Sequence, residues 1–108
     1  MTDEALIDPL GRRVILRDRT WFGHIVKGHP EVAEHRGLVE DAVRSPEEVR
    51  HSRSDDNCRV YLGQGPRETV RIMVVADVNA GVVKTAHLCK KPSGGALEWS
   101  KSTPSKEP

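Results

Sequence analysis

One stretch of this chain decides its fold: residues Thr69 to Cys89, which read T-V-R-I-M-V-V-A-D-V-N-A-G-V-V-K-T-A-H-L-C. Its first part, Thr69 to Val78, is the longest and most apolar strand candidate and predicts a central strand of a sheet. Asn79-Ala80-Gly81 has the composition of a short hairpin loop, and Val82 to Cys89 then alternates between two faces. The stretch therefore predicts an antiparallel hairpin in the middle of a β-sheet.

Shorter strands flank this hairpin in the C-terminal half of the chain. Cys58 to Leu62 alternates in the same way, and Val49 to Ser52 and Leu97 to Trp99 predict two further short strands. Gly63 to Pro66 has turn chemistry, and Lys90 to Gly95 reads as a cationic, glycine-containing loop. Together these segments predict an antiparallel sheet of four to five strands.

The N-terminal half has the periodicity of helices instead. Arg13 to Arg17 predicts a short strand, and Thr20 is a plausible N-cap for a helix over Trp21 to about Gly28. Pro30 prevents simple continuation of that helix, and a second helix is predicted from there to Val43. The expected fold is therefore α+β, with short strands and two helices packed on the C-terminal sheet.

Composition limits where and how such a chain acts. Its 108 residues suffice for one domain, which we expect over residues 1–99, followed by a disordered tail over 100–108. No apolar run approaches the roughly 20 residues that span a bilayer, and the acidic N-terminus lacks a secretion signal. We therefore expect a cytoplasmic protein. A net charge of +1 means that any anion site must come from local placement of Arg, Lys and His.

Neither a metal site nor a disulfide follows from the ligand-type residues. Cys58 and Cys89 lie far apart without a CxxC spacing, which favours free thiols in strands. His24 and His29 are five residues apart, so on a helix they point about 140° away from each other. The HExxH spacing is absent. We therefore expect no metal, no cofactor and no disulfide.

Strand parity sorts the polar candidates of the second half. Thr85 and His87 are two residues apart and emerge on one face of their strand, as Arg59 and Tyr61 do on theirs. If Val60 and Leu62 face the helices, these four side chains line the opposite, open surface. The alternative is an ordinary solvated sheet face.

Metal-free cleavage of RNA suits this inventory. The reaction needs a base for the 2′-hydroxyl, an acid for the departing 5′-oxygen, and cations or hydrogen-bond donors around the phosphate. Histidine serves either proton role near neutral pH. His29, at the C-terminal end of the first helix, is a further candidate because the helix dipole favours its protonated form, and Lys27 is placed to assist phosphate binding. The alternative for His29 is helix termination alone.

The pattern as a whole resembles the phage and bacterial members of the barnase–EndoU–colicin–RelE superfamily of small nucleases. The resemblance runs from Asp8 to Trp99. It rests on five segments: W-F-G-H-I-V-K-G-H-P-E (21–31), V-R-S-P-E-E-V (43–49), R-V-Y (59–61), I-M-V-V (72–75) and V-K-T-A-H (83–87). The resemblance implies helices on an antiparallel sheet and metal-independent RNA cleavage that leaves a 2′,3′-cyclic phosphate. The matching site positions are His29, Arg59 and Thr85, together with Lys84 and His87.

These observations lead to one preferred interpretation, an endoribonuclease acting on RNA. The resemblance further implies a toxin that is held in check by an antitoxin or immunity protein. We assign acid–base roles to His29 or His87, phosphate binding to Arg59 and Lys84, hydrogen-bonding support to Thr85 and Tyr61, and further substrate contacts to Lys27 and Lys90. Two alternatives remain: a non-catalytic module of the same fold that binds RNA or a protein, and a small metal-dependent hydrolase.

Overall fold

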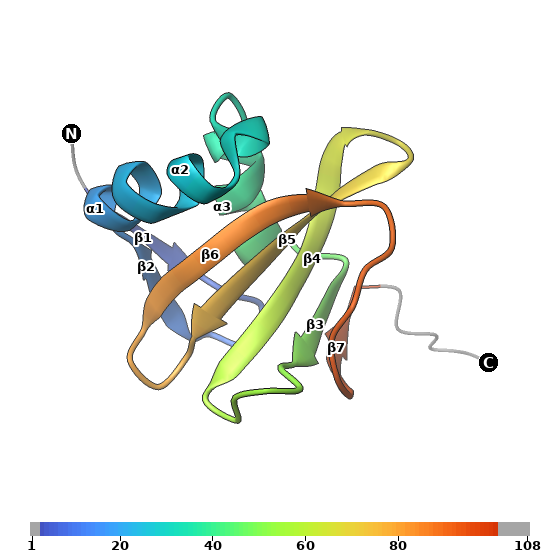
Figure 1. Ribbon diagram of the computed structural model, residues 1–108. Helices are drawn as coiled ribbons and strands as arrows, with labels where there is room; N and C mark the ends of the chain where they lie inside the picture. The colour runs from blue at the N-terminus through green and yellow to red at the C-terminus, as the bar shows by residue number, and fades with distance from the viewer. Residues whose placement is uncertain (1–2, 102–108) are drawn as a thin grey trace.

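A curled seven-stranded sheet with helices against one side is the architecture of residues 3–101, which the computed structural model describes (Figure 1). The strand order is β1-β2-β6-β5-β4-β3-β7, and every neighbouring pair is antiparallel except β2 and β6. The strands are β1 (Glu4–Ile7), β2 (Arg13–Leu16), β3 (Glu48–His51), β4 (Cys58–Arg67), β5 (Val70–Asp77), β6 (Val82–Cys89) and β7 (Leu97–Ser100).

The helices come in two groups. The first is one continuous helical stretch whose middle is π-helical, and a 3-10 turn follows it after one residue, His29. The second is the amphipathic helix that crosses β4 and β5. No helix of the described residues is long and apolar enough to cross a membrane. The helical elements are α1 (Asp18–Thr20), η1 (Trp21–Ile25), α2 (Val26–Gly28), η2 (Pro30–Val32) and α3 (Arg36–Arg44).

The α+β class is confirmed, but the sheet is larger than predicted and mixed. The N-terminal segments form a hairpin of β1 and β2 that joins the edge of the sheet through one parallel pairing, Ile15 with Val82. The predicted turn over Gly63 to Pro66 is wrong. Strand β4 continues to Arg67 because a register shift between Gln64 and Arg67 absorbs the irregular residues. The hairpin over β5 and β6 lies where it was predicted.

The helix boundaries also need correction. The first helix begins at Asp18, so Thr20 lies inside it. The Thr20 side chain makes no capping hydrogen bond, and the predicted N-cap is wrong. The predicted second helix is split into the 3-10 turn η2 and helix α3. Ser100 belongs to β7 rather than to the predicted tail, and residues 102–108 lie outside the described residues.

The hydrophobic core lies between the helices and one face of the sheet, which we call the inner face. Helix α3 approaches β4 so closely that a Cβ atom on Gly63 would lie 2.7 Å from the Cβ atom of Ala42. Only glycine permits this distance. The buried core residues are Leu6, Val14, Leu16, Trp21, Ile25, Val32, Val39, Ala42, Val43, Val49, Tyr61, Ile72, Val74, Ala76, Val83 and Ala86.

The register of the strands defines a second surface, which we call the open face. Cross-strand partners point to the same side of a sheet, so each ladder row belongs to one face. Ala86, Val74 and Tyr61 form an inner row, since all three are core residues. The two central rows of the open face are Thr85–Val75–Val60–Arg50 and His87–Met73–Leu62–Glu48.

Candidate active site

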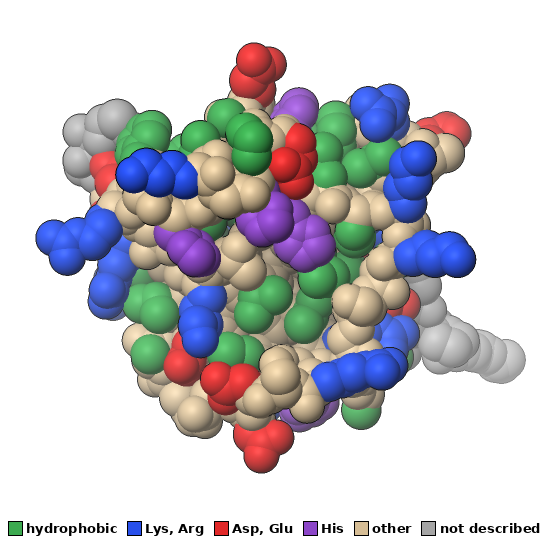
Figure 2. Space-filling view, viewed as in Figure 1, with side chains coloured by type: hydrophobic (Ala, Val, Ile, Leu, Met, Phe, Trp, Pro, Cys, Tyr) green, Lys and Arg blue, Asp and Glu red, His purple; other side chains and the backbone are tan. Residues whose placement is uncertain are grey.

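Two histidines from distant parts of the chain are stacked on each other. The ring centroids of His29 and His87 are 5.1 Å apart, with an angle of 29° between the ring planes. His29 lies between α2 and η2, whereas His87 lies in β6. The pair is accessible from solvent, and Figure 2 shows neighbouring histidine side chains near the middle of one surface of the molecule. The fold therefore brings together two of the groups to which the sequence assigned proton transfer.

The backbone explains how His29 reaches a strand of the sheet. Strand β6 pairs with β2 only near Val82 among the described residues, so the helical segments can pack against the rest of β6. The His29 amide donates to the carbonyl oxygen of Ile25 at 2.7 Å, and its own carbonyl accepts from the Val32 amide at 3.1 Å. Pro30 then starts a new turn. His29 is thus held on both sides.

Each ring has one nitrogen close to a polar neighbour. The Nδ1 atom of His29 lies 3.6 Å from the Oε2 atom of Glu31, a distance suited to an ion pair when the imidazole is protonated. The Nδ1 atom of His87 lies 3.2 Å from the carbonyl oxygen of Leu88. A neutral His87 that donates from Nδ1 keeps its Nε2 lone pair free. The two imidazoles therefore have different surroundings.

The other candidates on β6 and α2 make no hydrogen bond to this pair among the described residues. Thr85 is half-buried on the open face, two residues before His87. Lys84 is exposed at the register shift of β6, and Lys27 is exposed on α2. Lys90 is exposed directly after β6. Lys27, Lys84 and Lys90 make no hydrogen bond or ion pair with the described residues.

Arg59 and Tyr61 are not part of this surface, and their predicted placement is wrong. Tyr61 belongs to the inner face, where it is fully buried, and Arg59 is two residues before it on the same side of β4. Val60, expected to face the helices, lies on the open face instead. Parity groups side chains into two sets, but it does not decide which set faces the helices.

Arg59 and Tyr61 instead belong to a partly buried polar cluster that joins both ends of the curled sheet. Tyr61 donates its hydroxyl proton to Asp8 Oδ2 at 2.6 Å, and Arg12 Nε donates to the same oxygen at 2.7 Å. Arg12 Nη2 also donates to Glu98 Oε1 at 2.7 Å, and Arg59 Nε donates to Glu98 Oε2 at 3.0 Å. Each carboxylate therefore has at least two charged or hydroxyl donors.

The cluster shifts the pKa of its members in the directions expected from these bonds. Burial raises the pKa of the Asp8 carboxyl, but hydrogen bonds from Tyr61 and Arg12 outweigh it, so the pKa stays below its ordinary value. The pKa of Glu98 is likewise lowered by Arg12 and Arg59 against the opposing effect of burial. Burial and the bond to Asp8 both raise the pKa of Tyr61. The phenol is a fixed donor.

The sequence carried a partial signal for this cluster. Asp8 precedes Pro9, Leu10 and Gly11, which predicts a turn, and its Oδ1 atom does accept from the Leu10 and Arg12 amides at 2.9 Å. Nothing in that local pattern indicates a partner such as Tyr61, 53 residues away.

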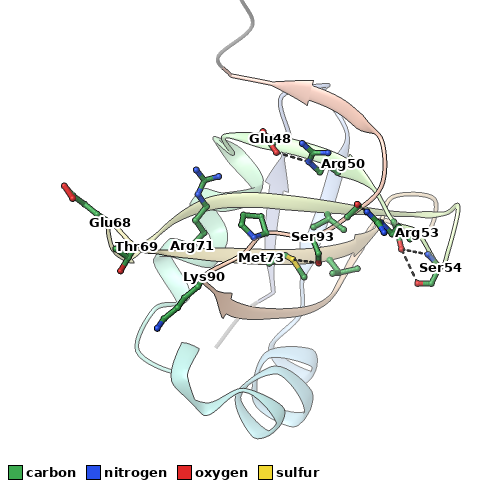
Figure 3. A pocket seen from close by; sticks show the side chains of 15 residues that line it. Glu48, Arg50, Arg53, Ser54, Glu68, Thr69, Arg71, Met73, Lys90 and Ser93 are labelled. Carbon is green, nitrogen blue, oxygen red and sulfur yellow. Dashed lines mark hydrogen bonds and ion pairs between the residues drawn. The ribbon is translucent and has the colours of Figure 1, made fainter.

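The open face also contains a groove, for which the sequence contained no signal. Its volume is about 1090 Å³, and Figure 3 shows Arg71 and Lys90 toward one end and Arg53 toward the other. Four lining residues are basic and two are acidic. The groove residues are Glu48, Arg50, Ser52, Arg53, Ser54, Val60, Glu68, Thr69, Arg71, Met73, Val75, Lys90, Pro92, Ser93 and Gly94.

The thiols and potential metal ligands are dispersed. Cys58 and Cys89 are both free, and burial raises the pKa of each thiol. Within residues 3–101, no group of three or more His, Cys, Asp or Glu side chains is placed to hold a metal ion.

Comparison with known proteins adds no relative: no family model, no curated protein and no solved structure matches this chain.

Proposed function

We propose that the protein is an endoribonuclease that cleaves RNA without a metal ion. The observation that carries this proposal is the contact between His29 and His87, whose rings stack with centroids 5.1 Å apart at an accessible surface. Cleavage of RNA by internal transesterification needs one group that accepts a proton and one that donates a proton at the same phosphate. Two adjacent imidazoles supply both.

The reaction balances within the substrate and these two side chains. The 2′-hydroxyl loses its proton to a neutral imidazole while its oxygen attacks the adjacent phosphorus. The bond from phosphorus to the 5′-oxygen breaks, and the imidazolium donates its proton to that oxygen. The products are a 2′,3′-cyclic phosphate and a free 5′-hydroxyl, and no electron or metal is consumed.

The surroundings of the rings support one distribution of these roles. His87 can donate from Nδ1 to the Leu88 carbonyl, which leaves Nε2 to accept the proton of the 2′-hydroxyl. His29 lies 3.6 Å from the Glu31 carboxylate, which is placed to form an ion pair with the imidazolium that acts as the acid. We therefore propose His87 as the base and His29 as the acid.

Charge on the phosphate is balanced by exposed cations. Lys27 is two residues from His29, and Lys84 and Thr85 are close in sequence to His87. We propose that these lysines and the Thr85 hydroxyl bind the phosphate oxygens as negative charge builds there. Arg59 takes no part because both Glu98 and backbone carbonyls already accept its hydrogens.

The test is cleavage of total RNA in excess EDTA by the wild-type protein and by His29→Asn and His87→Asn. Removal of a general acid or base lowers the rate by about 100-fold or more. His24→Asn is the matched control, because His24 is exposed on the same helical stretch and is outside the pair. We expect EDTA-resistant cutting by the wild type and the control only.

Three other outcomes contradict the proposal. Equal cutting by all four proteins indicates a contaminating nuclease. Cutting that EDTA abolishes indicates a metal-dependent hydrolase. Binding of RNA with no cutting by the wild type returns the non-catalytic module as the better description.

A further inference from the structure

We infer that the groove on the open face binds single-stranded RNA on either side of the cleavage point. The inference rests on the proposed function for the identity of the ligand as RNA, and it assigns a second binding site to residues that the proposed chemistry does not use. Its basis is the arrangement of charge and apolar surface within the groove (Figure 3).

The floor of the groove is apolar. Val60, Met73 and Val75 point from β4 and β5 into it, and the Ser93 hydroxyl lies 3.7 Å from the sulfur of Met73. Apolar side chains in an open groove bind a flat, weakly polar surface such as an unpaired base. Met73 is adaptable in shape, which suits bases of different size.

Basic groups lie at both ends of this floor. At the end near the β4–β5 turn, Lys90 makes no hydrogen bond or ion pair with the described residues, and Arg71 uses only Nη1, 3.0 Å from Glu47. At the other end, Arg53 donates from Nε to the Gly94 carbonyl at 2.8 Å. Its Nη atoms remain available for phosphate oxygens.

Arg50 joins the floor to the second basic end. It is oriented by Glu48, 2.9 Å from its Nε atom, and by the Gly95 carbonyl, 3.1 Å from its Nη1 atom. Because Glu48 already neutralises this guanidinium, Arg50 shapes the wall of the groove, and phosphate binding is assigned to Arg53, Arg71 and Lys90.

The dimensions favour a chain of several nucleotides over a mononucleotide. From Thr69 to Val75 the groove follows six residues of strand, or roughly 20 Å. Its volume of about 1090 Å³ exceeds that of a typical small-molecule pocket. The basic groups at the two ends suit the phosphates of such a chain, and the apolar floor between them suits its exposed bases. A duplex hides its bases and offers no such surface to the floor.

The groove lies next to the histidine pair. Met73 is the cross-strand partner of His87, and Val75 is the partner of Thr85. A chain bound along β5 therefore passes within one strand spacing, about 5 Å, of the strand that carries His87. The groove residues should bind the flanking nucleotides while His29 and His87 act on one phosphate.

The test separates binding from cutting. Fluorescence anisotropy measures the affinity of the protein for 2′-O-methyl oligonucleotides of two and eight residues, which lack a 2′-hydroxyl and cannot be cleaved. The variants are Arg53→Gln and Lys90→Gln. Arg19→Gln is the charge-matched control, because Arg19 is exposed on α1 and does not line the groove.

We expect the eight-residue strand to bind more tightly than the two-residue strand, and each groove variant to weaken that binding about fivefold and to flatten its salt dependence. The control variant should stay within about twofold of wild type, as distant surface changes do. Equal affinity of wild type and groove variants overturns the inference, as does an absence of binding. Equal binding of duplex RNA overturns the single-stranded assignment, and stronger competition by polyglutamate indicates an acidic protein segment instead.

Failure of the two proposals can be distinguished. If the protein binds RNA through the groove but cuts none, the nuclease proposal fails and the groove proposal stands. If the protein cuts RNA in EDTA and Arg53→Gln and Lys90→Gln leave KM unchanged, the nuclease proposal stands and the groove proposal fails.

Discussion

The inner and open faces of this sheet carry similar polar side chains but differ in how completely these side chains are paired. On the inner face, Tyr61 donates to Asp8 at 2.6 Å and Arg59 donates to Glu98 at 3.0 Å. Arg12 donates to both carboxylates. Such a cluster has little capacity left for a ligand. It ties the β1–β2 turn and β7, at opposite ends of the strand order, to β4.

Outside this cluster, the histidine pair and part of the groove contain polar groups that are incompletely paired. His29 and His87 stack at the surface, and each leaves Nε2 without a partner among the described residues. Lys90 and Arg53 in the groove likewise retain free donors. The comparison teaches that residue type alone does not distinguish the structural groups of this chain from those that we propose as functional. Whether their hydrogen-bonding capacity is already used does separate them.

The largest expected effect on the inner face comes from removing Asp8. In Asp8→Ala, Tyr61 loses its acceptor and Arg12 loses one of two carboxylates, which should lower the free energy of unfolding by about 3 kcal/mol. Urea denaturation followed by circular dichroism measures this change. Asp41→Ala is the control, since the Asp41 side chain is 69% exposed.

For activity we expect the opposite order of effects, with a small effect of Asp8→Ala and a large effect of His87→Asn. Asp8→Ala, assayed where it is still folded, should cut RNA at close to the wild-type rate, whereas His87→Asn should unfold near the wild-type urea concentration but not cut. A folded Asp8→Ala protein without activity would show that the two faces are not independent.

A smaller effect is expected for Arg59→Gln. Glu98 keeps its bonds from Arg12, so the loss of the Arg59 bond should cost about 1.5 kcal/mol of stability. Because Arg59 faces away from the histidine pair, kcat and KM for RNA should change less than about twofold. A loss of kcat of about 100-fold without loss of stability would restore Arg59 to the catalytic machinery.

The smallest effect is a dependence of stability on acid pH. The pKa values of Asp8 and Glu98 are lowered in the folded protein, so the unfolded chain binds more protons in acid. Their contribution is complete above about pH 5 and is lost as the pH falls through about 4 toward the folded pKa values. Thermal unfolding from pH 7 to pH 3 should show a shallower decline in Glu98→Gln than in wild type. Equal slopes would contradict a role for Glu98.

Much of the secondary structure was predictable because its signals are local. Val82 to Cys89 was expected as a strand with its observed bounds, and the loop before it contains Gly81 at a φ of 74°. The predicted turn over Gly63 to Pro66 was wrong because residues typical of turns also occur in a strand with a register shift. The start of the first helix was missed because no side-chain cap marks it.

The candidate site was less predictable because it depends on contacts between distant segments. The shared face of Thr85 and His87 follows from spacing alone, but the approach of His29 requires the packing of η1 and η2 on β6. Tyr61 lies on the inner face, where it bonds to Asp8, and no local pattern connects Asp8 to β4. Long-range contacts therefore decide which of these side chains lie together.

The central claim is most directly tested with an oligonucleotide that is cut in its all-RNA form. The test substrate keeps a single ribose at the cleaved position and has deoxyribose everywhere else. Acid–base transesterification by His87 and His29 predicts one cut, directly after that ribose, in the presence of EDTA, with a 2′,3′-cyclic phosphate on one product and a 5′-hydroxyl on the other. A cut at a deoxyribose position, or products that carry a 5′-phosphate, would contradict the account.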